Sequence, residues 1–285
     1  MIDEPAGDTV LGVISQFEYW ITSLGQAVTD RIEAFGKFTV FVGETFYWMF
    51  AKRVQRNALN HAMYNVGVLS VPVIMLTGMF IGMVLAVQCY TQFKAMFIET
   101  RLGAVINLSL VRELGPVLAA TMLAGRVGCS IAAELGTMRV TEQIDALTGM
   151  GTNPVYYLVV PRFLACLFLI PVLTIVADFM GVYGGAIYST TVLNISEHFY
   201  WQNSSNFVNL FDLFAGMFKS VFFGAAIALI SCYMGFTCDP GAEGVGKAAT
   251  KSFVMSFIAI LFLDLLLAVL LDQVYQLFWP VQKMI

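Results

Sequence analysis

The feature that most constrains the fold of this chain is a long run without a charged side chain. No Asp, Glu, Lys or Arg occurs from Ala62 to Phe93, and the run centres on the apolar segment Val66 to Tyr90. A helix needs about 20 predominantly apolar residues to cross the hydrocarbon core of a bilayer. The run therefore predicts a first transmembrane helix over about residues 66–90.

Composition extends this prediction to most of the chain. Of the 285 residues, 59% are hydrophobic and only 12% are charged, and the mean hydropathy is +0.79. Soluble domains carry about 25% charged residues, so this chain cannot cover a water-facing surface and is predicted to be an all-α integral membrane protein. Four further apolar runs predict spans at about residues 104–125, 163–188, 213–236 and 252–273.

The third apolar run continues to about Leu193. It is longer than the bilayer core requires, so it is expected to tilt, to bend at Pro171 or to project beyond the membrane.

The residues before the first span have a different composition. Residues 1–34 are acidic, which fits neither a secretory signal nor a transit peptide. Residues 35–56 are rich in aromatic side chains and end in a basic cluster, which is typical of an interfacial helix rather than a span. Such a helix is either a simple anchor or an elbow that clamps the bundle. We therefore divide the chain into an acidic segment, 1–34, and one domain, 35–285.

The distribution of Lys and Arg predicts the orientation of the spans, because cytoplasmic loops carry an excess of these residues. With a cytoplasmic amino terminus and five crossings, the carboxyl terminus is outside, and eight bases fall on the inner side against three on the outer side. The inner bases are Lys52, Arg53, Arg56, Arg126, Arg139, Arg162, Lys247 and Lys251, and the outer bases are Lys94, Arg101 and Lys283.

Four of the predicted spans contain ionisable residues: Arg112 and Glu113, Asp178, Lys219, and Asp264. Such residues are costly in a bilayer and usually face a bundle interior or a wet cavity. Arg112 and Glu113 either form ion pairs with other helices or meet a polar ligand. Lys219, near the start of its span, is expected to snorkel to the interface, and the two aspartates are expected to cap or pair with neighbouring helices. An ion or proton relay in a secondary transporter is the alternative function that these charges suggest.

The segment between the second and third predicted spans contains an amphipathic pattern. Val140, Ile144 and Leu147 recur at helical spacing and predict an apolar stripe on one short helix, while Glu142 and Asp145 form an acidic edge. The stripe must be buried against the protein's own bundle or against a partner, and the pattern alone leaves both open.

Several other patterns exclude function classes. The two histidines and five cysteines are scattered without metal-ligand spacing, so no metal site is predicted. Gly241 to Ala248 matches G-x-x-x-x-G-K but has Ala248 where a phosphate loop needs Ser or Thr. The sequence has no pattern of a nucleophile with a base, so a lipid-modifying enzyme is not predicted. A net charge of −4 offers no basic surface for nucleic acid.

Two G-x-x-x-G pairs, Gly78 with Gly82 and Gly181 with Gly185, predict close helix contacts, within one chain or between copies.

Longer stretches carry a resemblance to a known family, the MlaE-type permeases. It is densest over residues 108–162, and a later segment, GAEGVGKAATKSFV, is also similar to the family pattern except that Ala249 replaces a Thr. The resembling stretches are LVRELGPVL (Leu110 to Leu118), AGRVG (Ala124 to Gly128), AAELGTMRVTEQIDAL (Ala132 to Leu147) and NPVYYLVVPR (Asn153 to Arg162).

The resemblance implies a permease subunit of an ABC transporter that moves phospholipids or related lipids and maintains outer-membrane lipid asymmetry. It further implies a homodimer in the bacterial inner membrane, with cytoplasmic ATPase subunits on one side and an MCE-domain protein on the periplasmic side. ATP and Mg²⁺ would bind the partner ATPase, and this chain would hold no cofactor.

The resemblance also assigns roles to residues. Segment 129–151 would be a cytoplasmic coupling helix that contacts the ATPase through Glu134, Gly136, Thr137, Met138, Arg139, Val140, Glu142, Gln143, Ile144, Asp145 and Leu147. A lipid cavity between two copies would be lined by Met83, Val87, Tyr90, Arg112, Glu113 and Leu114.

Overall fold

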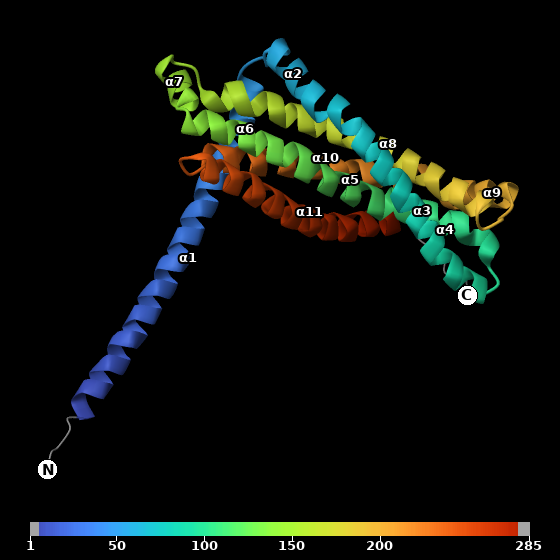
Figure 1. Ribbon diagram of the computed structural model, residues 1–285, viewed down its shortest axis with the longest axis horizontal. Coiled ribbons are helices and arrows are strands. Elements are labelled where there is room, and N and C mark those ends of the chain that lie inside the picture. Colours follow the sequence, from blue (N-terminus) through green and yellow to red (C-terminus); the bar gives the residue numbers. More distant parts are fainter. Residues whose placement is uncertain (1–5, 279–285) are drawn as a thin grey trace. The chain divides into compact units, whose positions relative to one another are not determined.

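The computed structural model describes residues 6–278, which are mostly helical with no β-strand in that range (Figure 1). The chain divides into two compact units, residues 1–47 and 48–285. Asp3, Glu4 and Lys283, which contribute to the charge patterns above, lie outside the described residues. The α-helices are α1 (Ala6–Ala51), α2 (Arg56–Val66), α3 (Val71–Ala95), α4 (Leu102–Ser109), α5 (Gly115–Leu123), α6 (Cys129–Val140), α7 (Gln143–Gly149), α8 (Val160–Thr191), α9 (Glu197–Phe207), α10 (Leu210–Phe236) and α11 (Ala242–Phe278).

The first unit consists of most of α1, a continuous helix of 46 residues. The sequence predicted a helix over residues 35–56, and α1 differs from this prediction at both ends. Helix α1 begins earlier, at Ala6, and ends at Ala51, so the chain leaves the helical conformation before Arg56. Within the unit, Lys37 and Glu33 form an exposed ion pair at 2.7 Å. The hydrogen bond and charge of Lys37 lower the pKa of Glu33.

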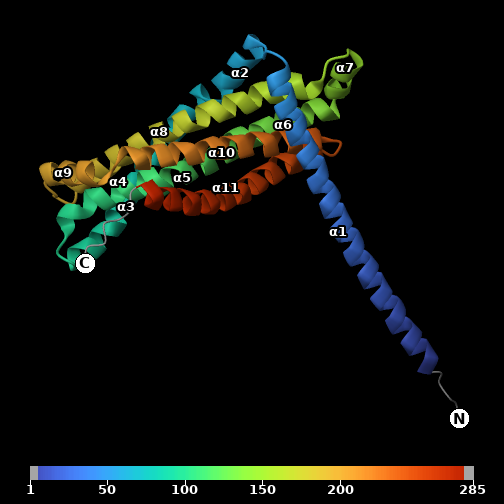
Figure 2. The same ribbon diagram turned by 180° about the vertical axis from the view of Figure 1, so that it is seen from behind.

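The second unit contains five helical stretches that are long and apolar enough to cross a membrane. Each of them contains one of the five predicted spans, which confirms the all-α membrane fold. In Figures 1 and 2, α9 lies at one end of this bundle and α7 at the other. The five stretches are Arg56–Ala95, Leu102–Val140, Val155–Thr191, Leu210–Phe236 and Ala242–Leu277.

The second stretch is longer than expected. Instead of ending near residue 125, the helix continues through α6 to Val140, about 58 Å at the usual rise per residue. Arg126, expected in an inner loop, therefore lies within a helix. Two π-helical turns, η3 (Leu110–Leu114) and η4 (Ala124–Gly128), interrupt this stretch, and a third, η5 (Val155–Val159), precedes α8.

The two G-x-x-x-G pairs meet each other within one chain. A Cβ atom at Gly82 would lie 1.9 Å from the carbonyl oxygen of Gly181, and one at Gly78 would lie 2.5 Å from that of Ala177. Only a residue without a side chain permits this approach of α3 to α8. The glycines are therefore used inside the protomer.

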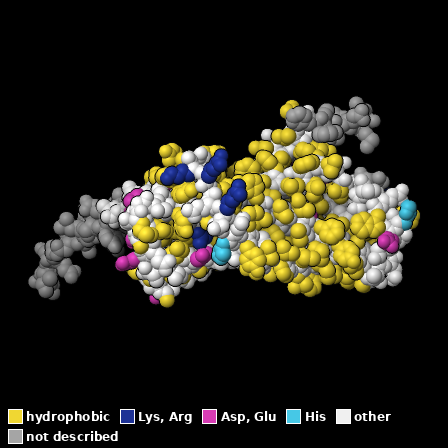
Figure 3. All heavy atoms as spheres, turned by 90° about the horizontal axis from the view of Figure 1, so that it is seen from above, with side chains coloured by type: hydrophobic (Ala, Val, Ile, Leu, Met, Phe, Trp, Pro, Cys, Tyr) yellow, Lys and Arg dark blue, Asp and Glu magenta, His cyan; other side chains and the backbone are white. Residues whose placement is uncertain are grey.

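The outer surface of the bundle is that of a membrane protein. Figure 3 shows a broad hydrophobic surface with charged side chains gathered toward the two ends. Large apolar side chains on α3 and α11, such as Phe80, Val84, Phe262 and Leu265, are about half exposed. Because lipid is as apolar as these side chains, they need no protein cover.

At the α9 end, a buried hydrogen-bonded group joins α9 to α4. The hydroxyl of Tyr200 donates to Asn107 Oδ1 at 3.2 Å, and Asn107 Nδ2 donates to Ser204 Oγ. Burial raises the pKa of Tyr200 to about 12, against a smaller lowering by the bond to Asn107. The hydroxyl thus stays protonated and remains a donor at neutral pH.

Candidate functional site

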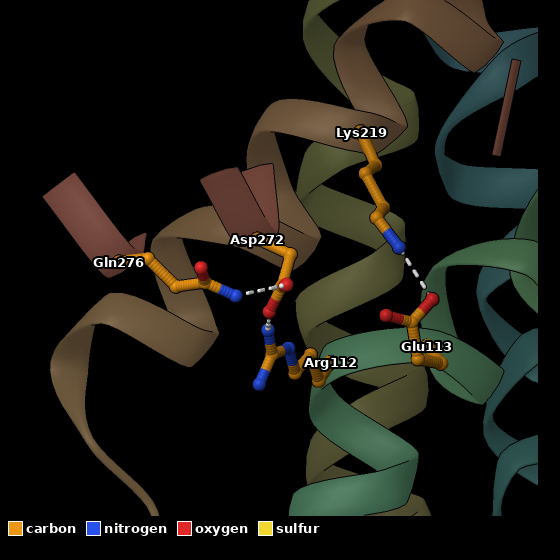
Figure 4. A network of polar contacts seen from close by, with 5 residues as sticks. All are labelled: Arg112, Glu113, Lys219, Asp272 and Gln276. Carbon is orange, nitrogen blue, oxygen red and sulfur yellow. Dashed lines mark hydrogen bonds and ion pairs between the residues drawn. The ribbon is translucent and has the colours of Figure 1, made fainter. Parts of the chain in front are cut away.

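A cluster of charged side chains joins three spans of the bundle (Figure 4). Arg112 and Glu113 come from the π-turn η3, Lys219 from α10, and Asp264 and Asp272 from α11. Arg112 is joined to Asp272, and Lys219 to Glu113 and Asp264. The cluster therefore ties three spans together by charge.

Lys219 is the most buried member of the cluster, with 1% of its side chain exposed. Its ammonium pairs with the carboxylate of Glu113 and lies 3.1 Å from Asp264 Oδ1. The expectation that Lys219 snorkels to the interface is therefore wrong. Two carboxylates on neighbouring helices make the buried position tolerable, because a buried charge is stable only when it is paired.

Arg112 pairs with α11 rather than with Glu113 beside it. Its Nη2 lies 3.5 Å from Asp272 Oδ1, and the Asp272 carboxylate also accepts a bond of 2.8 Å from Gln276 (Figure 4). The guanidinium carbon lies 6.0 Å from the centre of the Tyr275 ring, within the range of a cation–π contact. The sequence left two alternatives for Arg112, an ion pair with another helix or contact with a polar ligand. The ion pair is present in the single chain.

Asp272 was not among the expected site residues, although its spacing from Asp264 carries a signal. Asp264 and Asp272 are eight positions apart, which places them on one side of a helix at slightly more than two turns. Two acids on one face of an apolar span indicate basic partners on a neighbouring span.

Asp178 on α8 stands apart from the cluster. It is buried, and its Oδ1 has no hydrogen-bond partner among the described residues. A Cβ atom at Gly115 would lie only 1.7 Å from Oδ1, so a glycine is required opposite this carboxyl group. The expected pairing with a neighbouring helix is found for Asp264 but not for this oxygen of Asp178.

The six residues of the expected lipid cavity lie on two packing surfaces of the single chain. Helix α3, which carries Met83, Val87 and Tyr90, packs chiefly along α8, whereas η3 packs on α10. Glu113 keeps 42% of its side chain exposed, and Val87 is 45% exposed. A cavity lined by both groups and completed by a second copy stays a prediction.

The expected coupling helix is two helices. Val140 is the last residue of α6, whereas Ile144 and Leu147 lie on α7, so the predicted stripe on one helix is wrong. The break occurs at Glu142, which has a φ of 60° in the left-handed region, where Glu142 N donates to Arg139 O at 3.2 Å. This conformation ends an α-helix because it turns the chain away from the helix axis.

The remaining expected contact residues divide between these two helices. Gly136 and Ile144 are buried in the chain itself, whereas Glu142, Gln143 and Asp145 are exposed at the bundle end. Asp145 also forms an ion pair at 2.6 Å with Arg139 across the break. Ile144 of the expected stripe thus packs on the chain itself and the acidic edge is exposed, while contact of this segment with a partner stays a prediction. Glu134, Gly136, Thr137, Met138, Arg139 and Val140 lie on α6, Glu142 lies in the turn, and Gln143, Ile144, Asp145 and Leu147 lie on α7.

The five apolar helical stretches with charges paired between them define a multi-pass membrane protein. Residues 59–270 match the family described as Permease MlaE. The chain therefore belongs to the MlaE permease family.

Individual relatives cover most of the chain. A protein of Synechocystis sp., named a probable ABC transporter permease protein, is 42% identical over 81% of this chain and 88% of its own length. The intermembrane phospholipid transport system permease protein MlaE of Haemophilus influenzae is 34% identical over 88% of this chain and 97% of its own. The protein TRIGALACTOSYLDIACYLGLYCEROL 1, chloroplastic, of Arabidopsis thaliana is 37% identical over 75% of this chain and 61% of its own.

Proposed function

We propose that this chain is the membrane-spanning subunit of an ABC transporter that moves phospholipid or a related lipid. The observation that carries the proposal is the match to a relative named as a phospholipid transport permease. The match covers 88% of this chain and 97% of the relative. The relative named as an ABC transporter permease supports the same class. The transport would join the bacterial inner membrane to a conduit formed by an MCE-domain protein.

In this proposal the free energy comes from a separate chain. ATP and Mg²⁺ bind a cytoplasmic ATPase subunit, which docks on the end of the bundle formed by α6 and α7. The exposed acidic residues Glu142 and Asp145 provide polar contacts there. Because α6 continues the stretch that carries η3, a displacement that passes from α7 to α6 across the turn at Glu142 can reach Arg112 and Glu113 along one helical segment.

The lipid path in this proposal lies between two copies of the chain. Apolar side chains of α3, such as Met83 and Val87, would contact the acyl chains, and the polar face of η3 would contact the headgroup. The partly exposed carboxylate of Glu113 supports this assignment, because a purely structural pair would not require an open side.

The alternative, a secondary transporter with an ion or proton relay, was based on the charges within the spans. The structure pairs Lys219 with Glu113 and Asp264, and Arg112 with Asp272. These interhelical ion pairs support the ABC transporter over a relay through Arg112, Glu113 and Asp264, whereas Oδ1 of Asp178 has no such partner among the described residues.

Purification in mild detergent tests the proposal. We expect the chain to copurify with a nucleotide-binding subunit in equal amounts, and the reconstituted complex to transfer phospholipid only with hydrolysable ATP. The double substitution Glu142→Lys and Asp145→Lys should release the ATPase or abolish lipid-stimulated hydrolysis. Glu197→Lys, an exposed acid on α9 at the other end, is the matched control and should retain the ATPase. A chain that transports lipid without a nucleotide-binding subunit would overturn the proposal.

A further inference from the structure

A cavity of about 590 Å³ lies between α2, the second span and the start of the third span. Its volume is in the range of small-molecule sites, about 300–1,000 Å³. It contains none of the six residues of the expected lipid cavity. Leu69 and Tyr157, which line it, are 45% and 37% exposed, so the cavity is open at its side.

The walls of this cavity combine apolar and basic groups. Val66, Val127 and Leu158 supply apolar surface, whereas Arg126 and Arg162 supply two guanidinium groups. The only acid in the lining is Glu134, which is engaged by Arg162 at 2.9 Å. Among the Arg, Lys, Asp and Glu side chains of the lining, two bases and one acid leave one positive charge in excess. Figure 3 shows basic, acidic and histidine side chains gathered where the hydrophobic surface gives way to the polar end.

The excess charge belongs to Arg126. Its Nη1 donates to the carbonyl oxygen of Asn65 at 3.2 Å and to Ser70 Oγ, both neutral acceptors. No acid among the described residues forms an ion pair with it, and its Nη2 and Nε make no hydrogen bond there. A guanidinium has five N–H donors. Arg126 uses Nη1 to bond the segment that joins α2 to α3, and the N–H groups of Nη2 and Nε remain available for a ligand.

We propose that this cavity binds the phosphate group of a phospholipid through Arg126. An unpaired cation within a membrane span is costly unless an anion or water compensates it, and a phosphate oxygen makes a charge-assisted bond to guanidinium. The acyl chains leave past the exposed Leu69 onto the hydrophobic outer surface. This site is separate from the lipid path between two copies, and it does not depend on that path.

A lipid fits the cavity better than free phosphate does. The cavity opens beside three stretches long and apolar enough to span the membrane, and most of its lining is apolar. Inorganic phosphate has no apolar part to contact Val66, Val127 or Leu158 and would leave most of the volume unfilled. The apolar walls therefore select a phosphate that carries acyl chains.

Native mass spectrometry of the delipidated complex, with whatever subunits it retains, tests the proposal. The probes are dioleoylphosphatidylglycerol, dioleoylglycerol, which lacks the phosphate, and inorganic phosphate. We expect Arg126→Gln to weaken phosphatidylglycerol binding at one site per chain by about tenfold or more, the effect of losing a charge-assisted hydrogen bond. Dioleoylglycerol binding should be the same in both proteins.

Two further variants separate binding from folding. Ser130→Phe places a ring in the cavity from an exposed position and leaves Arg126 in place, so it should weaken phosphatidylglycerol binding as strongly. Arg53→Gln removes an exposed base that does not line the cavity, and it should bind as the wild type does.

Three results would overturn the proposal. The first is phosphatidylglycerol binding that neither Arg126→Gln nor Ser130→Phe alters. The second is equal affinity of the wild type for dioleoylglycerol, which would show that the phosphate is not recognised. The third is displacement of the lipid by millimolar inorganic phosphate with retention of one phosphate per chain, which would identify a soluble anion as the ligand.

Discussion

Lys219 shows how a single residue controls the stability of a membrane bundle. It is nearly inaccessible and is contacted by Glu113 and Asp264 from two other helices. Removing one partner of a buried charge network leaves the opposite charges uncompensated, which costs about 3–5 kcal/mol in soluble proteins. We therefore expect Lys219→Met to lower the free energy of unfolding by a similar amount, measured by thermal or denaturant unfolding in detergent.

Lys247→Met is the matched control, because Lys247 pairs at 2.7 Å with Glu243 but both side chains are mostly exposed. Such pairs contribute about 0–1 kcal/mol. The double variant Lys219→Met with Glu113→Gln should recover part of the loss, since it removes an unpaired carboxylate. Equal stability of the two lysine variants would contradict a structural role for Lys219. Normal lipid transfer by Glu113→Gln would assign Glu113 to packing rather than to the lipid path.

The burial of Lys219 could not be predicted from the sequence. A lysine near the start of an apolar run indicates snorkelling, and its partner Glu113 is 106 positions away. A pattern within one helix contains no information about a neighbour at that separation. Asp264 and Asp272 are different, because their spacing on one helix already indicates a shared face.

At the scale of elements, the contact of α3 with α8 depends on glycine. Because a Cβ at Gly82 would overlap the carbonyl oxygen of Gly181, Gly82→Ala forces the two helices apart. Overpacking of this kind costs about 1–3 kcal/mol, and a backbone atom cannot move aside as a side chain does. We expect a lower melting temperature in detergent and no change in the number of chains per complex.

Gly246→Ala on α11 is the control, because no atom lies within 4 Å of its added Cβ. Alanine is the better helix former by about 1 kcal/mol, so this variant should be as stable as the wild type or more stable. If Gly82→Ala instead dissociated the complex into single chains without loss of melting temperature, the glycine pair would belong to an interface between copies.

The elements themselves were largely predictable, and their interruptions were not. Runs of apolar residues located all five spans, because a helix that crosses the bilayer core needs about 20 predominantly apolar residues. The π-turn Leu110–Leu114 and the break at Glu142 lie in sequences with ordinary helical spacing. The turn carries Glu113, whose partner Lys219 lies 106 positions away, whereas the ion pair of Arg139 with Asp145 spans the break locally. The sequence also described the expected coupling segment as one helix, whereas the structure divides it into α6 and α7.

At the scale of the whole molecule, the two ends of the bundle differ in their number of Lys and Arg residues. Arg139, Lys247 and Lys251 lie toward the α7 end, and Lys94 and Arg101 lie toward the α9 end (Figure 1). Excess base marks the cytoplasmic side of a membrane protein. This side would also be the one where an ATPase docks on α7, so charge and proposed function require the same orientation.

Cysteine labelling tests this orientation. In a variant whose five free cysteines are replaced by alanine, Met96→Cys and Met150→Cys introduce exposed thiols at opposite ends of the second unit. A membrane-impermeant maleimide should label Met96→Cys in intact spheroplasts and Met150→Cys only after the membrane is permeabilised, with the cysteine-free protein as the blank. The reverse pattern would place α7 outside, where no ATP is available. It would also move the Arg126 cavity from the inner leaflet to the outer leaflet.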